Sequence, residues 1–102
     1  MEQVKVLGYA DNNVNLALSG DIDLSNAKEF YEAVAAAYGA QKGNIRFDCA
    51  ALNFIDSTAL GTFVKILKTV KTDGYGMSLF GLQPKIKKLF LICSLDSIMD
   101  IA

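Results

Sequence analysis

The sequence predicts a single α/β domain, with a mixed but mostly parallel sheet of four to five strands packed with helices, in the order β-β-α-β-α-β-α-(β). The chain has 102 residues, of which 52% are apolar, which is enough for one compact domain with its own core. Its apolar residues follow a period of two near the N-terminus and of three to four further along. Short apolar runs separate the helical stripes, and strands joined through helices of this length are parallel neighbours.

Two strands are expected at the N-terminus. Val14, Leu16 and Leu18 alternate with polar or small residues, which is typical of a half-buried strand. A weaker alternation over residues 4–6 indicates a shorter strand before it, and Asp11-Asn12-Asn13 supplies turn residues between the two. Because this connection is so short, the two strands must be antiparallel, which makes the sheet mixed.

The period then changes to that of a helix. Asn26 is predicted to cap its start, with Glu29 as the capping-box acid, and Gly39 to close its end. The apolar stripe of this helix consists of Ala27, Phe30, Val34, Ala37 and Tyr38.

A strand over residues 44–49 and a second helix follow. The helix ends at Asp73-Gly74, and its stripe, the strongest in the chain, consists of Leu60, Phe63, Val64, Leu67 and Val70. Residues 77–82 form a third core strand. Pro84 suits the first turn of a helix whose apolar face carries Ile86, Leu89 and Phe90, and a last short strand or tail contains Ile98 and Ile101.

Composition excludes several classes of function. The chain has no histidine, which removes the commonest general base and the commonest metal ligand. No Gly-rich phosphate loop is present and no serine has a base partner in a recognisable motif, so we expect a protein that is not an enzyme and has no cofactor. Ten basic and eleven acidic residues give a net charge of −1, which does not favour nucleic acid or an anionic membrane as a partner.

The sequence also indicates a cellular compartment. Its start, MEQVKVLGYA, lacks the basic and apolar regions of a signal peptide, and no apolar run approaches the roughly 20 residues that cross a bilayer. We therefore expect a cytoplasmic domain. Cys49 and Cys93 both lie in apolar stretches and are expected to be buried free thiols in that reducing compartment.

Function in such a sheet gathers at the carboxyl ends of the parallel strands, which places the loops around residues 20–26 and 53–58 on one rim. Asp56 or Ser57 would cap the second long helix there. The capping role alone and a phosphate acceptor at Ser57 are both open, because a helix start tolerates added negative charge. Gly61, inside that helix, costs about 1 kcal/mol relative to Ala, and an internal packing contact is the simpler explanation for it.

The other polar groups of the rim allow weaker interpretations. Asp21 and Asp23, with Asp56 nearby, could suggest a cation or nucleotide site, but a role of Asp23 in bracing its loop is favoured because Asp is a common turn residue. Lys85, Lys87 and Lys88 form a small basic patch, for which a solvated helix face is the simpler interpretation.

Three motifs, in order, resemble those of the STAS domain proteins, and specifically of the bacterial anti-sigma-factor antagonists. Gly20-Asp21-Ile22-Asp23 is similar to the family's G-[DE]-[LIV]-D, and Asp56-Ser57-Thr58-Ala59-Leu60-Gly61 is similar to its D-S-[ST]-G-[LIV]-G signature. The run from Pro84 to Phe90 resembles the opening of the family's next helix. The resemblance covers nearly the whole chain and implies one STAS domain over residues 1–102.

The resemblance implies a partner switch. Such an antagonist binds, when unphosphorylated, an anti-sigma factor that is also a serine kinase of the histidine-kinase-like ATPase fold, and this binding releases a sigma factor. The kinase would phosphorylate Ser57, and a metal-dependent serine phosphatase would reset it. The partner-binding residues that the resemblance implies are Asp21, Asp23, Asp56, Thr58 and Gly61.

The chain departs from the family pattern in two places. Ala59 replaces the usual glycine of the signature, which would add a methyl group at the docking helix, and the usual glycine after Cys93-Ser94 is absent. Thr58 adjoins Ser57 and is the alternative site of modification. The alternative function is a STAS scaffold subunit that is not phosphorylated, part of a constitutive complex of the lipid-transport or stress-sensing type.

Overall fold

One five-stranded sheet with the strand order β1-β2-β3-β4-β5 organises the computed structural model, which describes all 102 residues. β1 and β2 are antiparallel and every other neighbouring pair is parallel, so the predicted mixed sheet and element order are confirmed. The elements are β1 (Val4–Ala10), β2 (Asn13–Ile22), α1 (Ala27–Ala40), β3 (Asn44–Ile55), α2 (Ser57–Thr72), β4 (Met77–Phe80), α3 (Pro84–Ile92), a 3-10 turn (Leu95–Ser97) and β5 (Asp100–Ile101).

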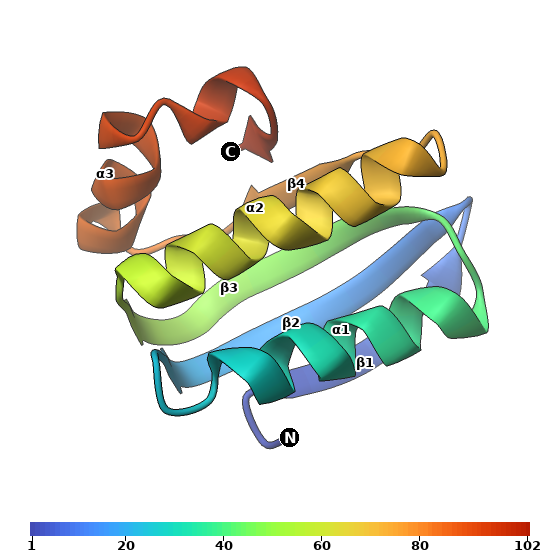
Figure 1. Ribbon diagram of the computed structural model, residues 1–102, viewed down its shortest axis with the longest axis horizontal. Coiled ribbons are helices and arrows are strands. Elements are labelled where there is room, and N and C mark those ends of the chain that lie inside the picture. Colours follow the sequence, from blue (N-terminus) through green and yellow to red (C-terminus); the bar gives the residue numbers. More distant parts are fainter.

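The helices are unevenly placed on this sheet. Helices α1 and α2 lie side by side across one face, and α3 lies on the other side of α2 from α1 (Figure 1). Pro84 stands at the first position of α3, as predicted, because the missing N–H of a proline costs nothing in the first turn of a helix.

The hairpin between β1 and β2 turns as predicted. Asp11 and Asn12 have φ angles of 54° and 63°, and the strands pair from Ala10 and Asn13 outward. Two successive residues with positive φ make a type I′ turn, whose twist matches that of the strands it joins, and Asp and Asn adopt that backbone more readily than most residues.

Strand β3 is longer than predicted, running to Ile55 and not ending at Cys49. It pairs with β2 along its whole length, but the register shifts at two points, between Ala17 and Ser19 and between Gly20 and Asp21. Each shift disturbs the two-residue alternation of inward-facing side chains, so the buried positions after Cys49 come at intervals of three. A search for period two therefore ends the strand too early.

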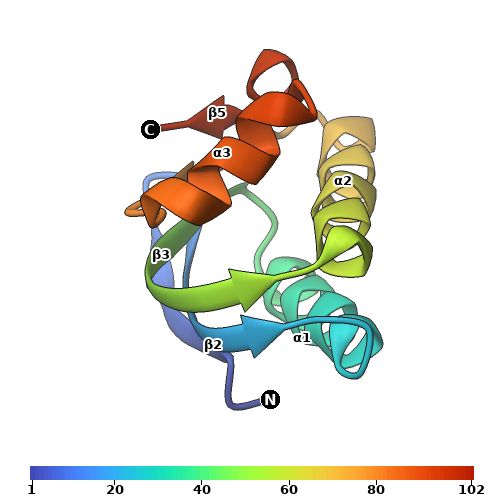
Figure 2. The same cartoon turned by 90° about the vertical axis from the view of Figure 1, so that its left-hand side faces the viewer.

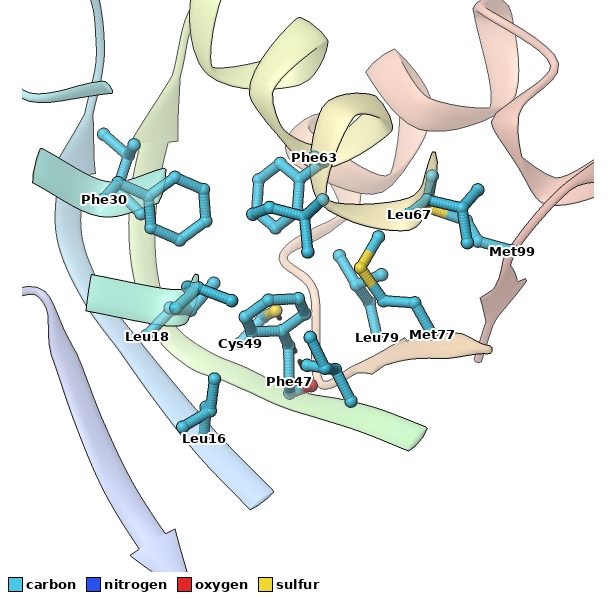
Figure 3. Close-up of a cluster of buried hydrophobic side chains, with 14 of the residues drawn as sticks. Leu16, Leu18, Phe30, Phe47, Cys49, Phe63, Leu67, Met77, Leu79 and Met99 are labelled. Atoms are coloured by element: carbon cyan, nitrogen blue, oxygen red, sulfur yellow. Dashed lines mark hydrogen bonds between the residues drawn. The ribbon is translucent and has the colours of Figure 1, made fainter. Parts of the chain in front are cut away.

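The core is built around four fully buried phenylalanine rings, from the sheet and all three helices. Figure 3 shows three of them, Phe30, Phe47 and Phe63. The ring centre of Phe63 in α2 lies 5.0 Å from that of Phe30 in α1, 5.4 Å from that of Phe47 in β3 and 5.4 Å from that of Phe90 in α3, each in an edge contact. Such edge-to-face pairs are favourable beyond the area they bury. Phe63 therefore joins the packing of every helix to the sheet.

Three predictions about the helices need correction, two on their apolar stripes and one on a helix end. In α2 the buried face is rotated slightly, so Ala59 and Ile66 are buried while Leu60 and Val64 are half-buried. In α3 only Ile86 and Phe90 reach the core, which leaves Leu89 40% exposed. The third correction concerns α1, which continues through Gly39 to Ala40 and is not closed by that glycine.

The two cysteines differ. Cys49 is buried as predicted, and burial raises the pKa of its thiol to about 12, so the thiol stays protonated. Cys93 is exposed, contrary to the prediction, because it follows the last turn of α3 beyond the residues that contact the core.

A hydrogen-bonded cluster joins the far ends of α1 and α2. The Tyr38 hydroxyl donates to Asp73 Oδ2 at 2.7 Å, and Lys42 Nζ lies 3.3 Å from the same oxygen. The bond from Tyr38, with a contribution from Lys42, holds the pKa of Asp73 below its usual range. This cluster fixes the two helices relative to each other at the end opposite the rim.

Gly43 is the glycine whose replacement we expect to damage the fold most. A Cβ at this position would lie 2.8 Å from the Asn12 carbonyl carbon and closer still to its oxygen, and that oxygen accepts a bond from the Asn44 amide at 2.8 Å. Gly43→Ala should therefore lower the free energy of unfolding by about 1–3 kcal/mol in a urea titration. Gly39→Ala, in open space on α1, is the control and should be neutral or stabilising; equal effects would contradict the account.

Candidate functional site

The predicted rim exists, at the carboxyl ends of β2 and β3. Asp21 pairs with Phe54 and Ile22 with Ile55, so the two strands leave the sheet side by side (Figure 2). β2 continues through a short loop into α1, and β3 is separated from α2 by Asp56 alone. The loop before α1 and the residue before α2 are therefore neighbours, although they lie more than thirty residues apart in the chain.

Asp56 joins these two segments and caps α2. Its Oδ1 accepts the Ala59 amide and its Oδ2 accepts the Leu24 amide, each at 2.9 Å. The first bond satisfies a free N–H of the helix start, which decides between the two predicted caps in favour of Asp56. The bond from the Ala59 amide, with that from Leu24, lowers the pKa of Asp56, so the carboxylate is ionised at neutral pH.

The loop before α1 is braced by its own side chains. Asp23 Oδ1 accepts the Ser25 amide at 2.9 Å and also the Ser25 hydroxyl, which confirms the predicted bracing role of Asp23. Asn26 accepts the Asp23 amide and donates to the Asp21 carbonyl, each at 2.9 Å. The Asn26 side chain is thus occupied within the loop and does not cap α1, so the predicted capping box is wrong.

Ser57 occupies the first position of α2 and is exposed. Its hydroxyl has no hydrogen-bond partner within the protein, since Asp56 supplies the cap. Thr58, the next residue, is also exposed, and its carbonyl accepts the Thr62 hydroxyl at 2.9 Å. Both hydroxyl-bearing side chains that could be modified are therefore accessible, and neither holds the helix start together.

The two small residues of the signature face opposite ways. A Cβ at Gly61 would meet nothing within 4 Å and the residue is exposed, so the expected internal packing contact is absent. Ala59, in contrast, is fully buried, which means that its methyl group adds to the core and not to the surface of the helix. At the other departure from the family pattern, Ser94 itself takes a left-handed backbone with a φ of 56°.

The rim brings together all the site residues predicted from the sequence. Asp21, Asp23, Asp56, Ser57 and Thr58 lie on the loops and helix start described above, and Gly61 lies one turn further along α2. The carboxylates do not converge, however: no group of three acidic or cysteine side chains is placed to hold a metal ion. Among the helices of the chain, none has both the length and the apolar character needed to cross a bilayer.

Sequence reasoning missed one residue of the rim. Leu24, at the tip of the loop before α1, has 76% of its surface exposed while its amide is held by Asp56. The signal in the sequence was a large apolar residue inside an otherwise polar loop, Asp-Ile-Asp-Leu-Ser-Asn. An exposed leucine on a fixed backbone offers a partner an apolar contact with little entropy to lose.

Comparisons with known proteins place this chain in a family. Residues 6–102 match the STAS domain family model. The anti-sigma-B factor antagonist of Listeria monocytogenes is 31% identical over 91 residues, which cover 88% of this chain and 79% of that protein. The anti-sigma-B factor antagonist of Bacillus subtilis is 30% identical over 92 residues, covering 90% and 84%. Both relatives are regulatory proteins by name.

Solved structures agree with this assignment. A Thermotoga maritima protein assigned as an anti-sigma factor antagonist superimposes with a TM-score of 0.83 at 26% identity, covering 92% of this chain and 81% of that one. The anti-sigma factor antagonist SpoIIAA in its unphosphorylated form has a TM-score of 0.74 over 97% of this chain and 86% of its own, and at 15% identity it shows the shared fold alone. By the family match and the 31% identical relative, the chain belongs to the STAS domain family, among the bacterial anti-sigma-factor antagonists.

Proposed function

We propose that this protein is the phosphorylation-controlled component of a partner switch. When unphosphorylated it binds an anti-sigma factor that is a serine kinase of the histidine-kinase-like ATPase fold, and so frees a sigma factor. Phosphorylation of Ser57 by that kinase ends the complex, and a metal-dependent serine phosphatase restores it. The protein itself performs no catalysis and acts in the cytoplasm.

The observation that carries this proposal is the state of the Ser57 hydroxyl. It is exposed, without a partner, and fixed at the first turn of α2 by a neighbouring cap that does not depend on it. A phosphoryl group there would face the free amides of the helix start, so the isolated protein tolerates it. Within an interface the same charge would lie against a partner surface, where an unpaired charge is costly.

The other site residues have separate roles in the proposed complex. Asp56 and Asp23 hold the two segments of the rim in place, Asp56 through both of its carboxylate oxygens. Asp23 uses only Oδ1 for this and presents Oδ2 to the partner. The exposed side chains of Asp21 and Thr58 contact the partner directly, and Gly61 lets the partner backbone approach α2.

A pulldown from a lysate of the organism that encodes the protein tests this function. Wild type and Ser57→Ala should both retain a protein with a histidine-kinase-like ATPase domain, identified by mass spectrometry, and Ser57→Asp should not. Retention of one partner by all three would instead favour the constitutive scaffold. If no anti-sigma factor is retained by the wild type, the proposed function is wrong.

Gly61→Ala should separate stability from binding. Because the added methyl group meets nothing within the protein, the substitution should raise the free energy of unfolding by about 1 kcal/mol, the usual helix-interior difference between Gly and Ala. The same methyl group would stand between α2 and the partner, and the affinity for the anti-sigma factor should fall by about tenfold, or about 1.4 kcal/mol.

Gly39→Ala on α1 is the matched control, since it is also a helical glycine in open space but lies at the end opposite the rim. It should gain stability without a change in affinity. Unchanged affinity in Gly61→Ala, measured by calorimetry, would remove Gly61 from the interface.

A further inference from the structure

A groove of about 290 Å³ lies between α1 and α2 and opens beside the rim. We call it the α1–α2 groove. Its walls include Lys28 and Tyr31 of α1, Thr58, Thr62 and Lys65 of α2, and Leu24 from the loop before α1. Because Thr58 directly follows Ser57, the groove continues the surface that surrounds the proposed phosphorylation site.

The groove is positively charged and its cations have no carboxylate partner. Lys28 and Lys65 contribute one ammonium group from each helix, and no acidic residue lines the groove. The one ion pair of the molecule, between Lys42 and Asp73, lies at the far end of the helices. Two like charges facing a common space favour an anion between them.

One of these cations is held in position by an aromatic ring. Lys65 Nζ lies 4.3 Å from the centre of the Tyr31 ring, a cation–π contact that spans the groove from α2 to α1. The Tyr31 hydroxyl also contacts the Thr69 hydroxyl at 3.2 Å, which fixes the ring. The side chain of Lys65 is therefore partly ordered before any partner binds, which lowers the entropy cost of binding an anion.

The surface on the other side of Ser57 has the opposite sign. Asp21, Asp23 and Asp56 make the strand ends acidic, while the α1–α2 groove beyond Thr58 is basic. A partner that covers both must be basic against the rim and acidic against the groove. This charge pattern specifies an oriented protein surface, because like-charge contacts in any other orientation are unfavourable.

We propose that the α1–α2 groove receives an acidic side chain, aspartate or glutamate, of the anti-sigma factor. The inference rests on the proposed function and adds the chemistry of the partner surface to it. The carboxylate of that side chain lies between Lys28 and Lys65, and its aliphatic part packs against Leu24 and Tyr31. A phosphoryl group on Ser57 then adds negative charge beside the bound carboxylate, which weakens the complex by direct repulsion.

This inference is tested by isothermal titration calorimetry. The titrant is the purified anti-sigma factor that the pulldown retained. Lys28→Gln and Lys65→Gln should each lower the affinity about tenfold, and the loss should shrink as salt is added. Lys71→Gln is the matched control, because it removes the same charge from an exposed position two turns further along α2, outside the groove, and should leave the affinity unchanged. Lys65→Arg keeps the cation and should retain affinity close to that of the wild type.

The possible failures are distinguishable. If both glutamine variants, shown to be folded by their thermal melts, bind the anti-sigma factor as the wild type does, the groove is not part of the interface and the proposed function stands. If Lys65→Arg loses as much affinity as Lys65→Gln, the charge is not what the partner recognises and the inference is wrong. If the wild type binds no anti-sigma factor, the proposed function and the inference fail together.

Discussion

Ser57→Asp is expected to lower the affinity for the anti-sigma factor by at least about a hundredfold, whereas Ser57→Ala should leave it within about twofold. The aspartate adds one negative charge at the exposed first position of α2, which complex formation would have to remove from water. The alanine removes a hydroxyl that has no hydrogen-bond partner in the protein, so no bond is lost. Calorimetric titration of each variant with the purified anti-sigma factor gives both affinities.

Neither substitution at Ser57 is expected to change the stability of the fold. Asp56 caps α2, so neither substitution at Ser57 removes the cap, and a carboxylate in the first turn interacts favourably with the helix dipole. Circular dichroism and thermal melts of the three proteins should therefore agree closely. Equal affinity of Ser57→Asp and the wild type would contradict the switch and leave a constitutive scaffold.

Asp56→Ala should cause the largest loss of stability at the rim. It removes the helix cap and the bond to the Leu24 amide together, which leaves two backbone N–H groups without their partner. Loss of a helix cap in a domain of this size lowers the Tm by about 4–8 °C, and the second lost bond adds to this. A thermal melt followed by circular dichroism at pH 7 measures the effect.

Asp56→Asn separates the two roles. Asparagine is a good helix cap, so its amide oxygen can keep the bond from Ala59. Its NH₂ group then faces the Leu24 amide, and two donors cannot bond each other. We therefore expect nearly normal stability of α2 but faster hydrogen exchange of the Leu24 amide, read by NMR. Equal exchange at Leu24 in the wild type and in Asp56→Asn would show that Asp56 does not hold the loop.

Acid should reduce stability through the same carboxylate. The pKa values of Asp56 and Asp73 are lower in the folded protein than in the unfolded chain, where Asp titrates at about 3.9. A carboxylate whose pKa is lowered by folding stabilises the folded protein at any pH above its pKa in the unfolded chain. This stabilisation is lost as the pH falls through its pKa in the folded protein. The Tm should thus be nearly constant down to about pH 5 and then decrease. The decrease should be smaller in Asp56→Asn, and an unchanged acid profile in that variant would contradict the role of its charge.

Local sequence signals predicted those parts of the fold that local physics determines. Asp11 and Asn12 tolerate the backbone of a tight hairpin, and Pro84 suits a helix start, so both positions agree with the structure. The end of β3 could not be predicted, because the register shifts beside Ala17 and Gly20 arise from pairing with β2 and have no local signature. The prediction that Cys93 is buried was wrong for a similar reason. Its exposure depends on how few residues of α3 contact the core, which is a property of the tertiary packing.

The candidate site was predictable where the chain order alone brings residues together. Parallel β2 and β3 place Asp56 beside the loop before α1, and the structure bears this out through the bond to Leu24. The faces of α2 were not predictable to better than about one residue, so Gly61 was expected to pack inside and Ala59 to face a partner. Lys28 and Lys65 line the same groove only because of the way α1 packs against α2, and no single segment of the sequence encodes that packing.

Incubation of the protein with the purified anti-sigma factor and ATP, followed by tandem mass spectrometry, tests the central claim most directly. The account predicts one phosphoryl group, on Ser57, and release of the modified protein from the complex in size-exclusion chromatography. Modification of Thr58 alone would move the switch by one residue. The absence of any phosphoryl transfer, with the complex intact in the presence of ATP, would contradict the account.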